Sequence, residues 1–160
     1  MAEGRRPPRR DYKPRDPSVT SRMMAAVKSK NSRAELLLRR ELWRRGRRYR
    51  LHHKGLIGRP DIVFAGWRLA VFVDSDFWHA RPLVAEGEAA LRATIRGARQ
   101  DWWVAKLARN AERDREVTSR LTSDGWSVVR VWESEVLADV SRVADLVERA
   151  LGQHRPQRRG

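Results

Sequence analysis

The chain has 160 residues and no cysteine, so disulfide bonds and zinc sites built on thiolates are excluded. It also has no run of about 18 to 20 apolar residues, the length that a membrane-spanning helix needs, and no signal peptide opens it. Acidic residues are few, because 20 Asp and Glu stand against 35 Lys and Arg. We therefore expect a cytoplasmic protein with no membrane-spanning segment.

The resulting net charge of +15 favours a polyanionic partner. Nucleic acid is the first expectation at a sequence pI near 11.5, and an acidic membrane surface is the alternative. Lysine is scarce, so most of the cations are arginine, whose guanidinium forks onto phosphate. Hydrophobic residues make up 41% of the chain and seven residues are tryptophan, which is enough for one compact folded domain.

Composition divides the chain into three parts. Residues 1–17 form a basic, proline-rich arm that we expect to be flexible, residues 18–152 form the folded domain, and residues 153–160 form a basic tail. Hydrophobic periodicity predicts helices near 18–27 and over 32–45, 102–123 and 136–151, and strands over 49–53, 61–64, 67–74 and 126–132. This order predicts an α/β fold, a single-domain mixed central β-sheet flanked by helices.

Local signals refine this outline. Ser32 and Glu35 predict a capping box at the start of the second helix, whose apolar face is expected to consist of Leu36, Leu37, Leu38, Leu42 and Trp43. Ala65-Gly66 predicts a hairpin turn, and the nearly continuous apolar run over 67–74 indicates a strand in the middle of the sheet. Residues 80–100 show no clear period, so we expect an irregular or partly helical excursion there.

Residues able to do chemistry gather around the two strands of the predicted hairpin. Asp61 ends the turn Gly58-Arg59-Pro60-Asp61, and Asp74 closes the next strand. Two carboxylates on adjacent strands can hold one Mg²⁺ through oxygen ligands. The alternative for Asp61 is a turn residue that caps its own backbone, whereas a carboxylate that closes an apolar strand is costly unless it reaches solvent or a cation. Asp76 adds a third nearby carboxylate, and a divalent cation would relieve the repulsion.

The residues just after Asp74 extend this pattern. His79 could activate water or protonate a leaving oxygen near a metal, although a lone histidine is more often structural. Phe77-Trp78 either packs in the core or forms a wedge that stacks against bases. Glu35, taken alone, is a solvated or capping residue.

Together these motifs resemble the very short patch repair (Vsr) endonucleases, a branch of the PD-(D/E)xK nuclease fold, which is restriction-endonuclease-like. No single motif is specific, but they occur in the family's order over about residues 18–151. The matching pieces are Ser21-Arg22-Met23-Met24; Ser29-Lys30-Asn31-Ser32 with Glu35; Gly58-Arg59-Pro60-Asp61; Val71-Phe72-Val73-Asp74 with Phe77-Trp78-His79; Trp103 with Lys106, Asn110, Arg113 and Asp114; and Gly125-Trp126 with Val131-Trp132-Glu133.

The resemblance implies Mg²⁺-dependent nicking of duplex DNA beside a T:G mismatch, which arises when 5-methylcytosine deaminates. It implies Asp61 as the main metal ligand and the Val73 backbone carbonyl as another, His79 as general acid/base, and Glu35 as support for the histidine or the attacking water. The basic arm would clamp the duplex. Residues expected to contact DNA are Met24, Phe77 and Trp78 at the mismatch, and Lys28, Lys30, Arg59, Arg109 and Arg113 elsewhere.

The chain also departs from the family pattern. Well-known members hold a structural zinc with cysteines and histidine around the catalytic loop, and no zinc is expected here. Some members have Thr-His where this chain has Val73-Asp74, and Asp74 restores the second carboxylate of the broader nuclease pattern, as a catalytic residue and metal ligand. The segment 81–101 looks longer than in compact members. The positions at or near the zinc ligands carry Asp76, Arg81, Leu83 and Ser134.

Two alternatives remain open at this stage. One is a nuclease of the same fold that serves in restriction or phage defence with another specificity. The other is a non-catalytic DNA-binding protein, against which the intact set of Asp61, Asp74 and His79 argues. For the repair function we expect a nucleoid-associated bacterial protein that acts as a monomer on double-stranded DNA, with a possible functional link to a cytosine-5 DNA methyltransferase.

Overall fold

The structure is a computed structural model and describes residues 31–153. The predicted arm and first helix, with Met24, Lys28 and Lys30, lie outside these residues, as do residues 154–160 of the tail. The elements in chain order are α2 (Arg33–Arg44), β1 (Arg50–Leu51), β2 (Ile62–Phe64), a 3₁₀ helix (Ala65–Trp67), β3 (Leu69–Asp74), α3 (Arg81–Glu86), α4 (Glu88–Thr94), α5 (Gln100–Ser123), β4 (Ser127–Trp132), α6 (Glu133–Ala138) and α7 (Val140–Gln153).

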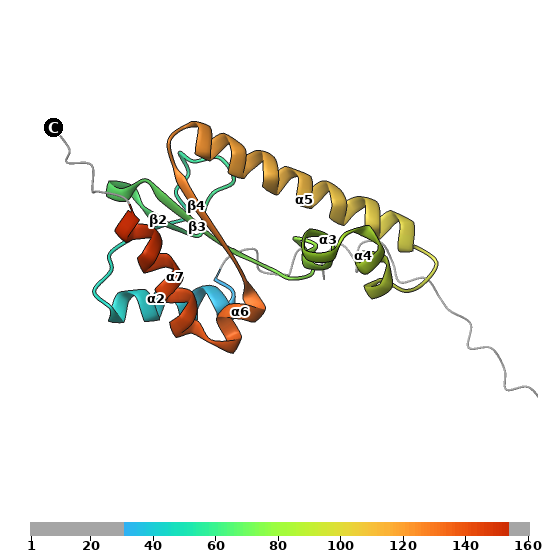
Figure 1. The fold of residues 1–160 in the computed structure, drawn as a ribbon, viewed down its shortest axis with the longest axis horizontal. Helices are drawn as coiled ribbons and strands as arrows, with labels where there is room; N and C mark the ends of the chain where they lie inside the picture. The colour runs from blue at the N-terminus through green and yellow to red at the C-terminus, as the bar shows by residue number, and fades with distance from the viewer. Residues whose placement is uncertain (1–30, 154–160) are drawn as a thin grey trace, which may run out of the picture.

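The four strands form one mixed sheet in the order β1-β2-β3-β4. β2 pairs antiparallel with β1 and with β3, whereas β3 and β4 run parallel. The parallel pair needs a long crossover, which is supplied by α3, α4 and α5 (Figure 1). The α/β fold with a mixed sheet flanked by helices is confirmed, and so is the interior position of β3.

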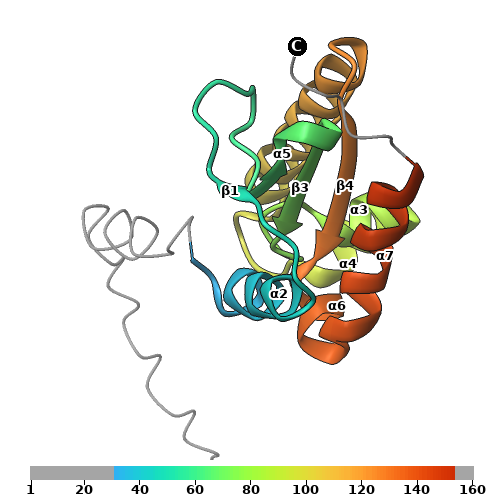
Figure 2. The ribbon, with the colours of Figure 1, turned by 90° about the vertical axis from the view of Figure 1, so that its left-hand side faces the viewer.

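Helices cover both faces of the sheet because β3 is apolar on both of its faces. Leu69, Val71 and Val73 belong to the core that packs under α2, α6 and α7. Ala70 and Phe72 alternate with them and pack against α5. Figure 2 shows α5 on one side of the sheet and α6 and α7 on the other. All six positions of β3 are buried, so Asp74 ends the strand inside the protein.

The start of α2 differs in part from its prediction. The Ser32 hydroxyl accepts from the backbone N–H of Glu35 at 3.2 Å, as expected for a cap. The Glu35 carboxylate, however, accepts from Asn31 N at 3.0 Å. It therefore binds the residue before the Ser32 cap, whereas a capping box would use the N–H of Ser32 itself. The predicted apolar face was also wrong at its edges, because the buried stripe has spacing i, i+4, i+8 and leaves Leu36 and Trp43 exposed. The residues buried on α2 are Ala34, Glu35, Leu38, Arg39 and Leu42.

The prediction of one terminal helix over 136–151 was wrong. Asp139 has a non-helical backbone (φ −156°, ψ 87°) that separates α6 from α7. Its carboxylate accepts from Arg142 N at 2.9 Å and so caps α7. The predicted turn at Ala65-Gly66 is a 3₁₀ helix that ends with Arg68 in the left-handed region at φ 48°. Residues 80–100 are partly helical, as expected, and form α3 and α4.

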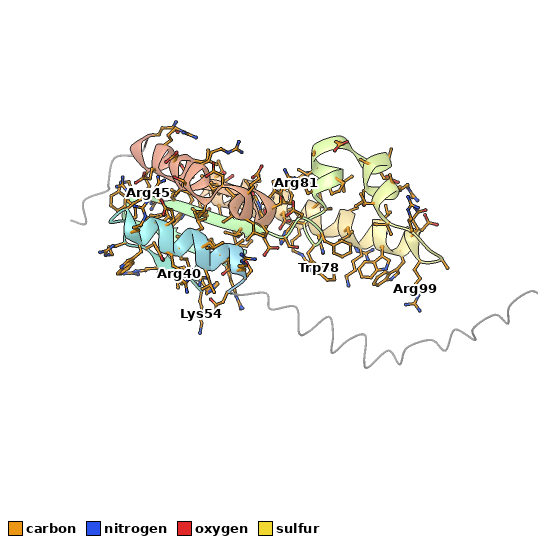
Figure 3. All side chains as sticks on the ribbon, turned by 90° about the horizontal axis from the view of Figure 1, so that it is seen from below. Arg40, Arg45, Lys54, Trp78, Arg81 and Arg99 are labelled. Atoms are coloured by element: carbon orange, nitrogen blue, oxygen red, sulfur yellow. The ribbon has the colours of Figure 1, made fainter. Side chains whose placement is uncertain are left out.

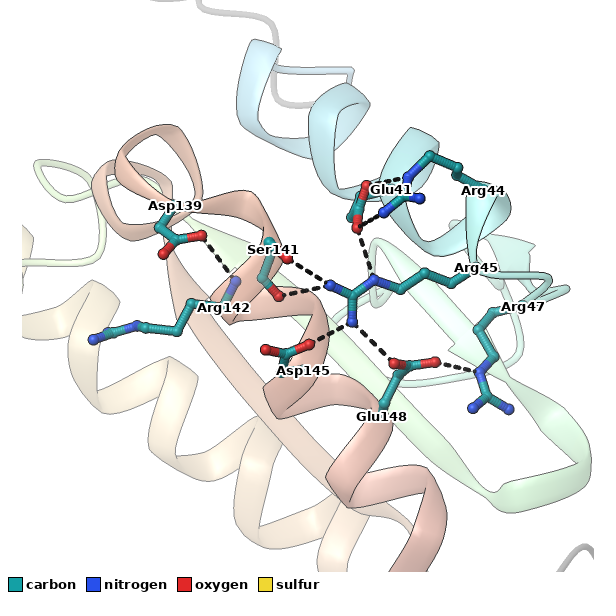
Figure 4. Close-up of polar contacts among 9 residues, drawn as sticks. All are labelled: Glu41, Arg44, Arg45, Arg47, Asp139, Ser141, Arg142, Asp145 and Glu148. Carbon is teal, nitrogen blue, oxygen red and sulfur yellow. Dashed lines mark hydrogen bonds and ion pairs between the residues drawn. The ribbon is translucent and has the colours of Figure 1, made fainter.

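An ion-pair network joins the end of α2 to α7 (Figure 4). The Arg45 guanidinium lies 2.5 Å from Asp145 and 2.9 Å from Glu148, and it donates to the Ser141 hydroxyl at 2.7 Å. Glu41 accepts from the same guanidinium at 2.7 Å. The network fixes α2, the helix that carries Glu35, on the body of the domain. Among residues 31–153, no helix combines the length and hydropathy needed to cross a membrane.

Candidate active site

Asp61 lies just before β2, next to the end of β3. Its backbone N–H donates to Val71 O at 3.0 Å, and its carboxylate Oδ2 accepts from Val73 N at 2.8 Å. The loop before it packs closely on α5, because a Cβ at Gly58 would overlap the side chain of Val117, and Gly58 has φ +75°. The structure therefore places the Asp61 carboxylate beside the backbone of Val73, one residue before Asp74.

Among residues 31–153, the ion-pair contact of the Asp61 carboxylate is with the His52 imidazole, and Arg39 lowers the Asp61 pKa only as the last of the causes. Burial raises the pKa of Asp61 to about 7, the hydrogen bond from Val73 N opposes this shift, and the charges of Glu35 and Asp74 add to it. The nearest imidazole nitrogen, His52 Nδ1, is 3.9 Å from Oδ1. A buried carboxylate held in this way favours a bound cation.

Glu35 and Arg39 lie beside Asp61 as a buried pair on α2. Arg39 Nη2 is 2.5 Å from Glu35 Oε2 and 3.0 Å from His52 Nε2, and Nη1 donates to Asn31 Oδ1 at 2.6 Å. Arg39 Nε is buried without a hydrogen-bond partner in the described part of the chain. The pair thus places a second carboxylate near Asp61 and connects it to His52, which completes the polar cluster on this side of β3.

Asp74 has a different environment on the other side of β3. The Arg130 guanidinium of β4 donates two parallel hydrogen bonds to the Asp74 carboxylate, from Nε to Oδ2 at 2.7 Å and from Nη2 to Oδ1 at 3.0 Å. The guanidinium lies 4.4 Å from the centre of the Phe72 ring and also 3.0 Å from Asp114 Oδ1. The sequence analysis required that this carboxylate reach solvent or a cation, and the cation that it reaches is Arg130. A metal role for Asp74 stays a prediction, because a metal would have to compete with Arg130.

His79 is oriented by Asp114 of α5. Its Nδ1 lies 2.6 Å from Asp114 Oδ2 and 3.7 Å from Asp74 Oδ1, which leaves Nε2 for exchange with solvent or substrate. Burial lowers the pKa of His79, but the Asp114 hydrogen bond and the charges of Asp74 and Asp114 together raise it above its ordinary value. These residues and Arg130 line a cavity of about 510 Å³, so the imidazole is open to water.

An aromatic cluster lies next to His79, at the start of α5. Ring centres of Phe77 and Trp78 are 5.0 Å apart, and Trp103 is 5.7 Å from Phe77. Phe77 and Trp102 are each about half exposed, at 48% and 50%. Lys106 Nζ lies 4.9 Å from the centre of the Trp102 ring. The cluster therefore combines exposed aromatic surface with a cation, and Phe77 is not a core residue.

Exposed cations accompany this cluster on one edge of the molecule. Figure 3 shows Arg40, Lys54, Trp78 and Arg99 along the same edge, and these three cations are exposed. Arg40, Lys54 and Arg99 were not among the predicted DNA contacts. The cations that were predicted and that the structure describes are also exposed: Arg59 before β2, and Arg109 and Arg113 on α5.

Three of the four positions at or near the family's zinc ligands contact one another. The Asp76 carboxylate lies 2.8 Å from Arg81 Nη1 and accepts from the Ser134 hydroxyl at 2.6 Å. Leu83 instead packs against the apolar cluster that includes Ala80 and Leu91. This part of the site is therefore held by an ion pair and hydrogen bonds between side chains.

The donor set near Asp61 fits a hard divalent cation with few protein ligands. Within residues 31–153, no three His, Asp or Glu side chains converge into a metal-binding group. Mg²⁺ does not need one, because it keeps several waters and is usually held by one or two carboxylates and substrate phosphates. The Asp61 carboxylate, with its raised pKa, and the Val73 carbonyl would hold it.

Sequence reasoning missed four members of the site, three of which left a signal. Arg130 interrupts the apolar strand 128–131, and Arg39 sits in the buried stripe of α2, so each needs a buried anionic partner. Asp114 belongs to a matching motif but received no role. His52 lay in a segment interpreted only as a strand.

The sequence of this chain is similar to those of known proteins. The family model described as "DNA mismatch endonuclease Vsr" matches residues 14–84. "Type II nicking enzyme V.NmeDIP" of Neisseria meningitidis serogroup C is 37% identical over 135 residues, 84% of this chain and 87% of that protein. "Type II nicking enzyme V.HpaIIP" of Haemophilus parainfluenzae is 32% identical over 129 residues, 81% and 87%. "DNA mismatch endonuclease Vsr" of Escherichia coli K12 is 31% identical over 118 residues, 74% and 71%.

The site and these relatives define a DNA endonuclease. The predicted recognition is thereby confirmed, and the alternative of a non-catalytic DNA-binding protein loses its support. The chain belongs to the Vsr family. Membership implies a divalent metal in the reaction, and DNA is the substrate.

Proposed function

We propose that the protein nicks one strand of duplex DNA beside a T:G mismatch in a Mg²⁺-dependent reaction. The observation that carries this proposal is the partly buried Asp61 carboxylate, which has a raised pKa and is 3.9 Å from the His52 imidazole, at one side of β3, with the His79–Asp114 pair at the other. The first supplies a place for a cation and the second an oriented proton carrier.

Asp61 and the Val73 carbonyl would hold Mg²⁺, and Asp74 stays a candidate third ligand that pairs with Arg130 in the absence of metal. When bound, the ion stabilises negative charge on the scissile phosphate and on the leaving oxygen. Glu35 acts near Asp61, whose pKa is raised by the negative charge of Glu35, rather than through a direct bond to His79. Of its two expected roles, support of the attacking water is the one that this position favours.

His79 moves the proton in this scheme. Asp114 binds Nδ1 and so fixes the tautomer and the direction of the ring, leaving Nε2 to exchange a proton with water or the leaving oxygen. Asn110 donates to Trp78 O at 3.0 Å and holds the neighbouring backbone on α5.

The duplex would lie along the edge that carries Arg40, Lys54, Trp78 and Arg99 (Figure 3). Phosphate contacts on this edge would supply most of the affinity, which should fall steeply with salt. The exposed ring of Phe77, with Trp78, is the proposed wedge, because aromatic side chains can unstack a base step. A wobble pair would be chosen because it deforms easily.

A second candidate function is nicking linked to restriction, with other specificity. It is favoured by the relatives whose names describe type II nicking enzymes. For the repair function we propose a monomer that works at the bacterial nucleoid and is linked to a cytosine-5 DNA methyltransferase, whose product creates the mismatch after deamination.

The test uses one end-labelled duplex with a single T:G pair and its matched C:G control, each with Mg²⁺ and with EDTA. Selective Mg²⁺-dependent cleavage beside the mismatched thymine supports repair. Equal cleavage of both duplexes supports the restriction-linked candidate instead. Tight binding without cleavage of either duplex would contradict both.

A further inference from the structure

The catalytic loop, residues 75–80, carries Phe77, Trp78 and His79 between β3 and α3. Its own hydrogen bonds are local: His79 N donates to Ser75 O at 3.1 Å, and Arg81 N donates to Asp76 O at 2.9 Å. Local bonds shape the loop but do not fix it relative to the sheet. On one side, α5 supplies that anchor through Asp114 and Asn110.

The anchor on the opposite side is the Asp76 carboxylate. It lies 2.8 Å from Arg81 Nη1, accepts from Ser134 N at 3.0 Å and accepts from the Ser134 hydroxyl at 2.6 Å. Arg81 Nη1 also donates to the Ser134 hydroxyl, and Nη2 is 3.6 Å from Glu135 Oε1. One carboxylate thus joins the loop to the first residues of α3 and α6.

Ser134, which accepts and donates these bonds, lies in a helix that packs in the same hydrophobic core as the elements around Asp61. Ser134 lies in α6, whose Val136 is 1% exposed in the main core. The same core contains α2, β2 and β3, which position Glu35, Asp61 and Val73. A bond from Asp76 to Ser134 therefore sets the position of the loop against the proposed metal site.

We propose that Asp76, Arg81 and Ser134 form a clasp that positions His79 relative to Asp61 by fixing the catalytic loop on α6. The inference rests on the proposed nicking activity, to which it adds two positioning residues, Asp76 and Arg81. Proton transfer requires a fixed geometry, and a small displacement of a catalytic group is costly in rate.

The clasp is expected to act on rate more than on stability. The side chains of Asp76 and Arg81 are each 35% exposed, and ion pairs at this exposure contribute little to folding. Burial raises the pKa of Asp76, but its bonds to Arg81 and Ser134 exceed that effect and hold the pKa below its usual value, so the clasp is charged at neutral pH.

The kinetic test compares Asp76→Ala and Arg81→Ala with Arg92→Ala. Arg92 is a matched control, since it is an exposed arginine with two acidic partners, Glu88 at 2.8 Å and Asp101 at 2.6 Å, outside the site. Single-turnover nicking at saturating enzyme should fall about 10- to 100-fold in the two clasp variants. The Kd for DNA should stay within about twofold, and Arg92→Ala should match wild type.

A conservative variant separates positioning from folding. Asp76→Asn keeps an acceptor for Ser134 N and Arg81 while it removes the charge, so its rate should lie between those of wild type and Asp76→Ala. Wild-type rates in the clasp variants would overturn the proposal. So would a loss in Kd as large as the loss in rate, because the loop would then serve DNA binding alone.

Hydrogen exchange supplies a readout that does not need activity. Amides of residues 75–81 should exchange faster in Asp76→Ala and Arg81→Ala than in wild type or Arg92→Ala, while α2 and α5 stay unchanged. If wild type nicks neither duplex, the proposed function fails, yet this exchange still decides the clasp. Unchanged exchange in residues 75–81 would overturn it.

Discussion

The two sides of the carboxyl end of β3 each hold a carboxylate, buried at Asp74 and partly buried at Asp61, and the two charges have different partners. Asp74, on the α5 side, has both oxygens gripped by Arg130, which also reaches Asp114. Asp61, on the α2 side, has one backbone N–H at 2.8 Å and an imidazole nitrogen at 3.9 Å. The first charge is compensated by the fold, whereas the second is left for a ligand.

This difference suits the α2 side and the α5 side of β3 to different roles in the proposed reaction. A buried charge without a partner lowers stability unless a cation binds, so the α2 side is the part of the site that the folded protein leaves incomplete. The paired charges on the α5 side are complete without a ligand, and they orient His79 through Asp114. The proposed metal site and the proposed proton carrier thus lie on opposite sides of one strand.

The largest effect is expected from Asp61→Asn. Nicking of the T:G duplex should fall on the order of 10³-fold or more, because the proposed metal would lose its main ligand. DNA affinity should change little, since phosphate contacts lie elsewhere. Single-turnover nicking and a binding titration measure the two quantities. Asp145→Asn, in the network between α2 and α7, is the control. Near-normal nicking by Asp61→Asn would contradict the metal role.

The free energy of unfolding should change in opposite directions when a residue is substituted on the α5 side and on the α2 side of β3. Arg130→Met leaves Asp74 and Asp114 without their cation and should destabilise the fold by about 3–5 kcal/mol, measured by urea unfolding at neutral pH. Asp61→Asn removes an uncompensated charge, so it should be neutral or stabilising in the absence of metal. The variant Asp74→Asn with Arg130→Met should recover part of the loss. A destabilising Asp61→Asn would show that Asp61 is compensated after all.

The fold could be predicted from the sequence where a hydrophobic pattern is compatible with only one kind of secondary structure. The apolar run before Asp74 indicated a strand covered on both faces, and the structure places β3 between β2 and β4. The break in the terminal helix was missed, because apolar residues such as Val136 and Val140 continue the helical period across it. Only the capping contact of Asp139 with Arg142 N ends that pattern, and such a contact depends on the local backbone.

The site was predictable only in its local parts. Asp61, Asp74 and His79 could be found because each follows a strand or turn in sequence. Their partners could not, since Arg130 is 56 residues from Asp74 and Asp114 is 35 residues from His79. The parallel pairing of β3 with β4 brings Arg130 beside Phe72, and no local pattern encodes that register.

The smallest effect expected is a pH dependence that belongs to one side of the strand. The folded pKa of Asp61 is about 7 against an ordinary 3.8, and its side chain is only 15% exposed. Between these values the folded protein keeps a proton that the unfolded chain releases. The stability contributed by protonated Asp61 is therefore complete below the ordinary pKa and is lost as the pH rises to about 7, with a slope of up to about 1.4 kcal/mol per pH unit.

Subtracting the unfolding free energy of Asp61→Asn from that of wild type isolates this slope from the other titrating groups. In EDTA this difference, wild type minus Asp61→Asn, should fall steadily as the pH rises from about 5 to about 7. Mg²⁺ should reduce it, because the ion competes with the proton for the same carboxylate. A flat difference in EDTA would mean that Asp61 titrates normally, and the contrast between the two sides of β3 would then not extend to their charges.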